Sequence, residues 1–286
     1  MNVNNMITIV IVVYNSSNII FDCLKSLENF KIIIVDNGKN SKTLDKLRLK
    51  KNITIVAPGK NVGMGRGANF AFKSIKTDFF LLLSPDIEMS EVSIKNLITT
   101  VSNNKNCAIA APLNITDSDS YGVLPEKRNL YEKNKNRIHF IKENLSSKPE
   151  GEICVDVTKG CALLINSKYF SQVGGFSEKY FLFWEELDLC RKFLKKGLSI
   201  IVNPLSITHH KEGSSSKIDL ENLFIRSYHH EISPLFYFNV KKNSLHLYKN
   251  MLKYLFRMIS YFLIFNFKNS LKNFSKLYAN ITYVLK

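Results

Sequence analysis

Apolar and polar residues alternate in blocks over the first 112 residues of the chain. Short, almost wholly apolar runs predict buried strands at Ile7–Val13, Ile32–Val35, Ile53–Ala57, Phe79–Leu83 and Cys107–Ala110. Segments of helical spacing lie between them, at Ile19–Asn29, Lys42–Lys50, Met64–Lys76 and Glu91–Asn103. Strands that alternate with helices in this way predict βαβ units, and therefore an α/β fold with a mostly parallel central sheet.

The pattern changes three times after residue 112. Residues 114–150 are polar and weakly periodic, and we interpret them as a variable loop region. Regular structure resumes with predicted strands at Ile153–Thr158, Cys161–Ile165 and Ser199–Val202, and with a helix over Trp184–Lys196 that Gly197 ends. From Lys217 onward, Phe, Tyr, Leu and Lys recur at helical spacing. We therefore expect one domain over residues 1–216, in two halves of about 1–112 and 151–216, and a helical tail over 217–286.

Positive charge is concentrated in this tail. The chain of 286 residues carries a net charge of +16, and +9 of it lies in Arg226–Lys286, where Glu231 is the single acidic residue. Basic and aromatic residues intermingle in Leu245–Phe267, which predicts an amphipathic helix lying on an anionic membrane surface. A helix packed on the preceding domain or on a second copy fits the pattern equally well. The longest uncharged run, Met258–Phe267, is far shorter than the roughly 20 residues that span a bilayer.

Composition excludes several other classes of protein. The five cysteines are scattered and never spaced as Cys-x-x-Cys, which predicts a reducing compartment without disulfides or structural zinc. The basic excess lies among apolar tail residues and shows no recognised nucleic-acid motif, so we expect no nucleic-acid partner. No glycine fingerprint follows the first strand, which argues against a nicotinamide-dependent oxidoreductase.

Two aspartates follow the ends of predicted strands. Asp86 comes directly after Ser84-Pro85, and Asp36 begins an Asp-Asn-Gly sequence. Ligands bind beyond the carboxyl ends of strands in open parallel sheets, and Mg²⁺ takes only one or two protein carboxylates. Asp86 is therefore a candidate metal ligand, and Asp36 a candidate ligand of a base or ribose. The alternative for both residues is an ordinary turn.

Three further segments carry candidate chemistry. The glycine-rich run Asn61–Asn69 precedes a helix and suits a phosphate, although its glycines also suit a simple loop. Glu185, Glu186 and Asp188 lie in the first turn of the predicted helix Trp184–Lys196, where a carboxylate can act as general base or merely complement the helix dipole. His210 can complete the coordination of a metal, or it can be a structural or exposed residue.

The order of these motifs resembles inverting glycosyltransferases of family 2. The resemblance is closest to the rhamnosyltransferase-like branch that builds bacterial surface polysaccharides such as O-antigen and capsule, and it covers about residues 6–215. The motifs that carry it are Val13-Tyr14-Asn15, Val35-Asp36-Asn37, Asn61-x-Gly63 with Asn69, Ser84-Pro85-Asp86, Gly174-Gly175-Phe176, Glu185-Glu186-x-Asp188 and His210-x-x-Gly213.

The resemblance implies a GT-A fold, in which a Rossmann-like nucleotide-binding half (about 1–112) precedes an acceptor half (about 151–216). It implies that Asp36 contacts the base of a nucleotide diphosphate sugar and that Asp86 is the remaining carboxylate of an Asp-x-Asp metal motif. Ser84 stands at the other motif position, so Mg²⁺ or Mn²⁺ would depend on Asp86 and His210. The remaining residues implied for the donor site are Tyr14, Asn15, Asn61, Gly63, Asn69 and Ser84.

The same resemblance implies that Glu186, where the family usually has aspartate, is the catalytic base, with Glu185 as the second candidate. Trp184 and Asp188 would lie on the acceptor side. The expected reaction moves L-rhamnose from dTDP-rhamnose to a lipid-linked saccharide; galactose, galactofuranose and N-acetylglucosamine donors stay open. We expect a cytoplasmic enzyme, peripheral on the inner face of the bacterial membrane, with its oligomeric state open. The alternative is a catalytically decayed, membrane-associated nucleotide- or sugar-binding protein.

Overall fold

The structure, a computed structural model, describes residues 5–14, 19–38, 44–115, 121–125, 149–210 and 219–286. Asn15, most of the predicted loop region and part of the predicted helix Lys42–Lys50 lie outside these residues. The chain divides into two compact units. The first comprises residues 1–125, 138–178 and 186–216, and the second comprises residues 126–137, 179–185 and 217–286. The predicted domain boundary after residue 216 stays a prediction.

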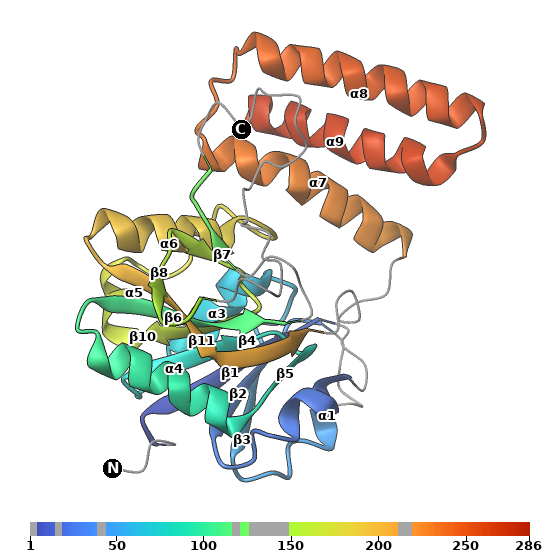
Figure 1. The fold of residues 1–286 in the computed structure, drawn as a ribbon. Helices are drawn as coiled ribbons and strands as arrows, with labels where there is room; N and C mark the ends of the chain where they lie inside the picture. The colour runs from blue at the N-terminus through green and yellow to red at the C-terminus, as the bar shows by residue number, and fades with distance from the viewer. Residues whose placement is uncertain (1–4, 15–18, 39–43, 116–120, 126–148, 211–218) are drawn as a thin grey trace. The chain divides into compact units, whose positions relative to one another are not determined.

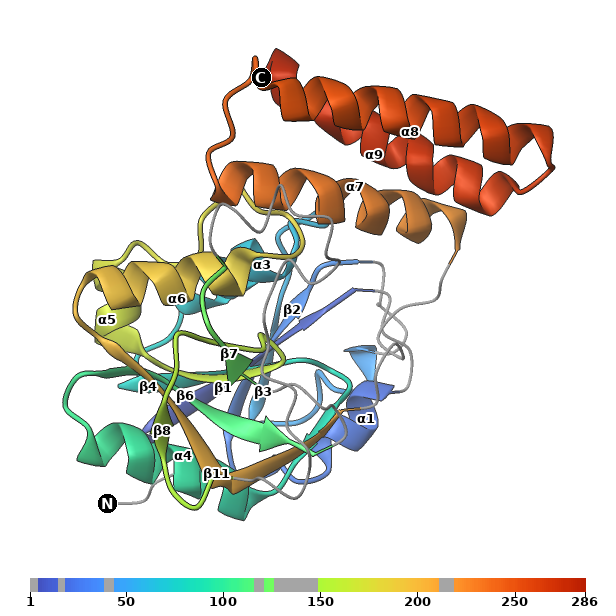
Figure 2. The same ribbon diagram turned by 45° about the horizontal axis from the view of Figure 1, so that its top comes forward.

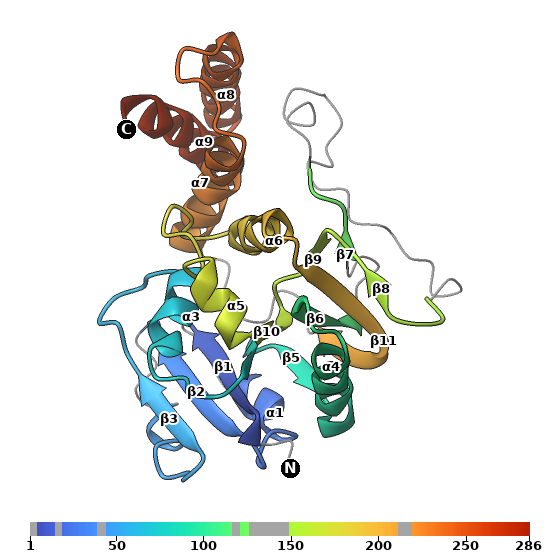
Figure 3. The ribbon, with the colours of Figure 1, turned by 90° about the vertical axis from the view of Figure 1, so that its left-hand side faces the viewer.

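The first unit is built on a mixed sheet of nine described strands (Figures 1 and 3). Its order is β3 (Ile53–Val56), β2 (Lys31–Asp36), β1 (Ile7–Val13), β4 (Phe79–Leu83), β10 (Ala162–Asn166), β6 (Cys107–Asn114), β11 (Ser199–His210) and β5 (Ile87–Met89). β8 (Ile153–Cys154) also pairs with β11, and β7 (Tyr121–Gly122) pairs with β9 (Val157–Thr158) in a separate small sheet. β1 to β4 pair in parallel, as predicted, whereas β10 runs antiparallel to both of its neighbours.

Helices cover both faces of this sheet. Figure 3 shows α1 (Ile19–Leu24) and α4 (Glu91–Asn103) on one face, and α3 (Met64–Phe72) and α5 (Ser167–Gln172) on the other. Every residue of β4 is buried, because a strand between two helical layers has no solvent face, and this burial accounts for its unbroken apolar run. The rings of Phe72 on α3, Phe170 on α5 and Phe80 on β4 contact one another edge-on or tilted. These contacts pack the two helices on the sheet.

The predicted strand Ser199–Val202 is too short. β11 continues to His210 because its register with β6 shifts between Asn203 and Ile207, a shift that accommodates Pro204 without ending the strand. β5 was not predicted, since three residues are too few to show a period. The predicted ranges of β1, β4 and α4 match the structure. The helix predicted over Trp184–Lys196 is α6 (Glu185–Lys195).

Among the described residues, the second unit contains α7 (Leu220–Tyr237), α8 (Leu245–Leu263), α9 (Phe267–Leu285) and a short aromatic segment, residues 179–185. α8 and α9 lie side by side in Figures 1 and 2. Their shared core with α7 includes Ile232, Leu247 and Ala279. The predicted helical tail is therefore confirmed. Within the described residues, no helix is long and apolar enough to cross a membrane.

Buried polar contacts tie the three tail helices together. Glu231 on α7 is 2% exposed and accepts hydrogen bonds from the Tyr254 hydroxyl at 2.8 Å and the Asn280 amide at 3.3 Å. The Tyr283 hydroxyl on α9 lies 2.7 Å from the carbonyl oxygen of Val240, which follows α7. Because buried polar groups are costly unless paired, these contacts favour one arrangement of the helices over others.

Gly67 allows α3 to approach β1. A methyl group added at Gly67 would lie 2.9 Å from Cγ1 of Val12. We therefore expect Gly67→Ala to lower the free energy of unfolding by ~1–3 kcal/mol, despite the higher helix propensity of alanine. Urea unfolding measures the change. Gly151→Ala is the control, because nothing lies within 4 Å of its added methyl group; a Gly67→Ala protein as stable as this control would contradict the packing argument.

Candidate active site

Polar residues gather at one edge of the parallel half of the sheet. The register pairs Val13 with Asp36 and Ile11 with Leu83, so β1, β2 and β4 end near one another. Asp36 Oδ1 accepts a hydrogen bond from the Gly38 N–H at 3.1 Å, so the turn expected as one alternative is present. Its contact with a base stays a prediction, as does the donor-site role of Tyr14, which directly follows β1.

Asn37 organises the glycine-rich loop, a role that the sequence analysis missed. It is 2% exposed, and its amide donates to Asn61 Oδ1 at 3.0 Å and to the Gly63 carbonyl at 3.1 Å. Its own oxygen accepts from the Val62 N–H at 2.9 Å. An asparagine directly after a strand was the available signal, but only the fold shows that it faces a loop 24 residues later.

Two glycines of that loop are needed for different physical reasons, one for its backbone conformation and one for close packing. Gly63 precedes α3 with φ at 84°, a conformation that glycine adopts readily. Gly65 instead allows Phe176 to pack closely, because an added Cβ would lie 3.0 Å from the Phe176 side chain. Asn69 donates to the Phe176 carbonyl at 2.8 Å and accepts from the Phe176 N–H at 2.9 Å. Its amide therefore fixes the turn before Phe176, and its predicted contact with the donor stays a prediction.

Asp86 and His210 are brought together by strand pairing. Ser84 to Ile87 form a turn, closed by the Ile87 N–H donating to the Ser84 carbonyl at 3.2 Å. β5 begins directly after Asp86 and pairs with the end of β11, where His210 stands opposite Ile87. Asp86 is 4% exposed, and its Oδ2 lies 3.6 Å from His210 Nε2.

This pair suits a divalent cation as part of its ligand set. Two ligands at right angles, each about 2.1 Å from a metal, lie about 3 Å apart, so the two side chains would approach each other by about 0.6 Å from their 3.6 Å separation to share an ion. Among the described residues, no group of three or more His, Cys, Asp or Glu side chains could hold a metal. Asp86 and His210 therefore fit an ion that takes its remaining ligands from a bound diphosphate and water, as Mg²⁺ commonly does.

Cys23 contacts the turn of residues 84–87. Its thiol is buried and lies 3.8 Å from the Ser84 carbonyl oxygen. Burial, followed by the charges of Asp86 and Glu88, raises the pKa of the Cys23 thiol to about 12. The thiol therefore stays protonated at neutral pH and adds no charge beside the candidate metal ligands.

Glu186 and Glu185, the two predicted candidates for the base, differ in exposure, and the role of either as base stays a prediction. Glu186 lies in the first turn of α6 and is partly exposed, whereas Glu185 is 3% exposed. Burial raises the pKa of Glu186 to about 6, which brings it closer to the value ideal for a general base at neutral pH. Gly160 leaves it room, since an added Cβ there would lie 3.3 Å from the Glu186 Cβ. Gly160 is not among the site residues predicted from the sequence.

Trp184 and Asp188 both make contacts within the protein. The Trp184 ring is 3% exposed and lies 5.0 Å from the Tyr237 ring. The Asp188 carboxylate accepts a hydrogen bond from Arg191 at 2.6 Å and lies 3.7 Å from Lys192 Nζ. These contacts are structural, and the acceptor-side role of both residues stays a prediction.

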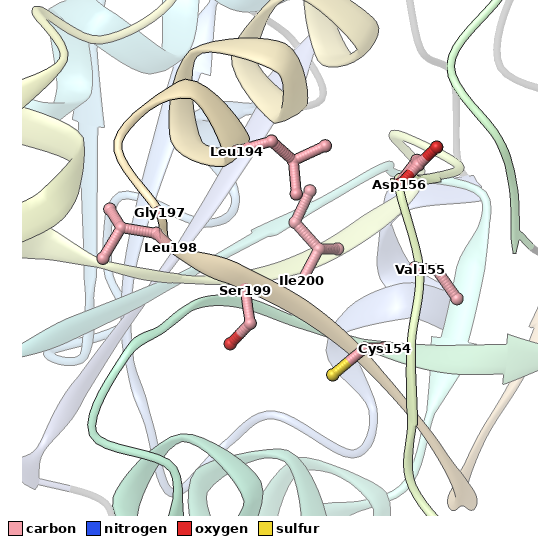
Figure 4. Close-up of a pocket in the computed structure, with 8 residues that line it drawn as sticks. All are labelled: Cys154, Val155, Asp156, Leu194, Gly197, Leu198, Ser199 and Ile200. Carbon is pink, nitrogen blue, oxygen red and sulfur yellow. The ribbon is translucent and has the colours of Figure 1, made fainter.

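Two surface cavities are lined by other residues of the first unit. One, of about 230 Å³, is lined by Cys154–Asp156, Leu194 and Gly197–Ile200 (Figure 4). The second, of about 300 Å³, lies beside Glu150–Glu152 and Asn203–Leu205. None of the predicted site residues lines either cavity, so neither bears on the predicted donor site.

The chain is similar to known proteins in sequence and in fold. The family model described as glycosyl transferase family 2 matches residues 8–166, more than half of the 286-residue chain. The chain belongs to glycosyl transferase family 2. The matched range contains Asp36, the glycine-rich loop and Asp86, and it ends before α6 and His210. It is thus a glycosyltransferase, as the order of its motifs predicts.

Several relatives of this family 2 glycosyltransferase are named as rhamnosyltransferases, among them the following two. It is 25% identical over 235 residues to the N-acetylglucosaminyl-diphospho-decaprenol L-rhamnosyltransferase of Mycobacterium tuberculosis (strain CDC 1551 / Oshkosh), covering 72% of this chain and 73% of the relative. It is 26% identical over 236 residues to the dTDP-rhamnosyl transferase RfbF of Shigella flexneri, covering 78% of this chain and 75% of the relative. The predicted resemblance to the family and its rhamnosyltransferase-like members is confirmed.

Solved structures agree on the fold. The crystal structure of GalNAc-T7 with UDP, GalNAc and Mn²⁺ matches with a TM-score of 0.57 at 12% identity, covering 80% of this chain. The chain spans 51% of that protein, about half its length. At this identity the likeness concerns the fold alone, and the predicted GT-A fold is confirmed.

The raised pKa of Glu186 predicts a pH-dependent effect on stability. Its folded-state pKa of about 6 exceeds the ordinary value of 4.5, so the folded protein binds more protons between these values. Ionised Glu186 therefore destabilises the fold, and stability falls as pH rises through this window. We expect Glu186→Gln to melt at a higher temperature than the wild type at pH 8.

This advantage should shrink as pH falls through 6 and vanish below 4.5. Thermal melts between pH 4 and pH 8 measure it. Glu178→Gln, which removes an exposed carboxylate, controls for the change in net charge. A Glu186→Gln protein that parallels this control at every pH would contradict the raised pKa.

Proposed function

We propose that this family 2 glycosyltransferase transfers L-rhamnose from dTDP-rhamnose to a hydroxyl of a lipid-linked saccharide. The reaction would serve the assembly of bacterial surface polysaccharide. The observation that carries the proposal is the Asp86–His210 pair, 3.6 Å apart beyond the end of β4. The names of the M. tuberculosis and S. flexneri relatives support the choice of donor sugar and of a lipid-linked acceptor.

The donor would bind along the carboxyl edge of β1, β2 and β4. Asp36 contacts the base in this proposal, with Tyr14, Asn15 and Ser84 completing the nucleotide site. Gly63 lies at the N-terminus of α3, where backbone N–H groups and the helix dipole favour a diphosphate. Asn61 accepts a hydrogen bond from the Gly63 N–H at 3.0 Å and so sets the entry to the helix, while Asn69 fixes its far side.

Asp86 and His210 would hold a divalent metal, Mg²⁺ or Mn²⁺. Their oxygen and nitrogen atoms suit either ion, and the similar fold of GalNAc-T7 was solved with Mn²⁺ and UDP. When bound, such an ion neutralises negative charge on the leaving diphosphate. Ser84 supplies a hydroxyl where the family motif has a second acidic residue, so the protein's own share of the metal site rests on Asp86 and His210.

Glu186 would act as general base in a single displacement. Its carboxylate takes the proton of the acceptor hydroxyl, whose oxygen bonds to the anomeric carbon of the donor sugar. The bond between that carbon and the diphosphate oxygen breaks, and the electron pair leaves with the diphosphate, so configuration inverts. The deeper burial of Glu185 makes it the second candidate. Trp184 and Asp188 would shape the acceptor side.

A lipid-linked acceptor would place the enzyme at the cytoplasmic face of the membrane. The inward face of α8 is packed through Leu247, Asn250 and Tyr254. Its other faces and the turn into α9 expose apolar side chains, among them Leu252, Phe256, Ile259, Phe262, Leu263, Ile264, Phe265 and Phe267. Lys249, Lys253 and Arg257 form an exposed basic stripe along the same helix. We propose that this surface, called the α8 face below, lies on anionic lipid.

The donor proposal predicts metal-dependent binding of one nucleotide. Purified protein should gain thermal stability with dTDP plus Mn²⁺, more than with UDP plus Mn²⁺ or with dTDP alone, because a ligand of the folded state stabilises it. Asp86→Asn should lose this gain while its unliganded melting temperature stays near that of the wild type. With dTDP-rhamnose and acceptor, both Asp86→Asn and Glu186→Gln should be nearly inactive.

Wild-type turnover by either variant would remove the role given to that residue. A UDP preference would redirect the proposal to another donor sugar. Nucleotide binding without transfer from any donor would favour the decayed, sugar-binding scaffold instead.

The membrane proposal predicts binding to anionic vesicles through the α8 face. The wild type should co-sediment with vesicles containing phosphatidylglycerol, less so at high salt, because the basic stripe is screened. Replacing Lys249, Lys253 and Arg257 by Gln should weaken binding at least about tenfold, since each basic residue near such a surface contributes ~1 kcal/mol. Phe256→Ser combined with Phe265→Ser should weaken it as well.

Leu49→Ser is the matched control, because Leu49 is 88% exposed in the first unit. Equal binding by all variants would contradict the proposal. A wild-type dimer that the phenylalanine substitutions convert to monomer would show instead that the α8 face joins two copies.

A further inference from the structure

The segment between β9 and β10 reaches the candidate site, although none of its residues was predicted to take part. Gly160 lies in the middle of this segment, between Lys159 and Cys161. Gly160 does not have a positive φ, so its φ does not call for a glycine. The reason for a glycine at this position therefore lies in the space around it.

Two other elements of the first unit come close to Gly160. A Cβ added at Gly160 would lie 3.3 Å from Cβ and 3.4 Å from Cγ of Glu186, on α6. It would also lie 3.5 Å from Cε of Met64, the first residue of α3. Gly160 therefore lies where the N-terminus of α3 and the candidate base approach each other.

The next residue joins the same place to the turn of residues 84–87. The Ser84 N–H donates to the Cys161 carbonyl at 2.8 Å, and this bond continues the antiparallel pairing of β10 with β4. Because the two strands run antiparallel, Gly160 is one residue further toward Asp86. The start of α3, the turn before β5 and the first turn of α6 thus converge on residues 160 and 161, all within the first unit.

The place where these elements converge is open to solvent. Met64, Gly160 and Glu186 are each partly exposed. Gly63 and Leu187, which adjoin Met64 and Glu186 along the chain, are buried. A small molecule can therefore reach all three of the partly exposed residues.

The proposed reaction requires a sugar ring at such a place. In the proposed donor site, the diphosphate binds at the N-terminus of α3, and Glu186 takes the proton of the acceptor hydroxyl. In a single displacement, the anomeric carbon lies between the leaving diphosphate oxygen and the attacking hydroxyl oxygen. The sugar must therefore extend from the N-terminus of α3 toward Glu186, and Gly160 lies on that path.

We propose that Gly160 is a specificity-determining residue of the donor site. The sugar ring of the nucleotide sugar lies over its backbone, with Met64 on one side and Glu186 on the other. A side chain at position 160 would occupy the volume of the ring, whereas the nucleotide and its diphosphate would bind as before. Met64 is apolar and flexible, so it can adjust to the ring. The inference rests on the proposed function, from which it takes the donor site and the base.

The test compares the affinities for dTDP and dTDP-rhamnose, because only the second ligand carries a sugar ring. Isothermal titration calorimetry with Mn²⁺ measures both. Gly160→Ala and Gly160→Val should bind dTDP as tightly as the wild type does. Their affinity for dTDP-rhamnose should fall by about tenfold in Gly160→Ala and by more in Gly160→Val, because each added methyl group takes space from the ring.

Met64 gives independent access to the same space. Met64→Phe enlarges the side chain on the other side of the ring and leaves Gly160 in place, so it should also weaken dTDP-rhamnose more than dTDP. Met64→Ala should restore part of the donor affinity of Gly160→Ala, since residues that share one space have non-additive effects.

Gly151→Ala is the matched control, because nothing lies within 4 Å of its added methyl group. It should leave both affinities unchanged. A glycine needed only for close packing on α6 would instead lower the melting temperature of its variants and leave the ratio of the two affinities at the wild-type value. That unchanged ratio in the Gly160 variants overturns the proposal. If they fail to fold, an unchanged ratio in Met64→Phe overturns it.

These outcomes separate the inference from the proposed function. A wild type that transfers another sugar overturns the choice of dTDP-rhamnose alone, and the same comparison is then made with that donor and its nucleotide. A wild type that transfers sugar, and whose Gly160 variants bind the donor as tightly as it does, overturns the inference alone. A full-length wild type that transfers no sugar from any nucleotide donor removes both proposals.

Discussion

The antiparallel pairing of β5 with the far end of β11 is the contact on which the candidate site depends. Asp86 lies in the turn between β4 and β5, so the course of β5 determines where its carboxylate points. The pairing sets His210 opposite Ile87 and closes the edge of the sheet beside Asp86. Without the register shift that carries β11 past Pro204, the histidine would have no fixed place near this turn.

The proposed donor side of the site is held by polar contacts with the backbone. Asn37 joins the end of β2 to the glycine-rich loop, and Asn69 joins α3 to the turn at Phe176. Both asparagines use donor and acceptor together, which fixes the amide orientation and the position of the loop backbone. Binding residues on loops gain precision in this way from a rigid scaffold. The sheet and helices thus determine where a diphosphate could meet the N-terminus of α3.

The two units differ in what their apolar residues accomplish. In the first unit, the apolar strands are buried between helical layers, so the apolar residues of the sequence are also the buried ones. In the second, a small shared core and the buried Glu231 hold three helices together, while much of the apolar surface of α8 remains exposed. Monomeric proteins rarely expose so many neighbouring apolar side chains without an interaction partner. Within the same helical unit, aromatic contacts also join α7 to residues 181–184.

The sequence by itself determined the alternation of strands and helices, the ranges of β1, β4 and α4, and the motif order that marks the family. These features depend on local periodicity and on residues close together in the chain, which a linear reading contains. The resemblance implied that Asp86 and His210 share a metal, but only tertiary structure shows the strand pairing that brings them together. Tertiary structure alone decided that Asn37 holds the glycine-rich loop and that α7 contacts Phe183 and Trp184. Each of these pairs residues from 24 to 124 positions apart, as between Asn37 and Asn61 or Asp86 and His210. Contacts over such separations follow from strand register and helix packing, which no local pattern specifies.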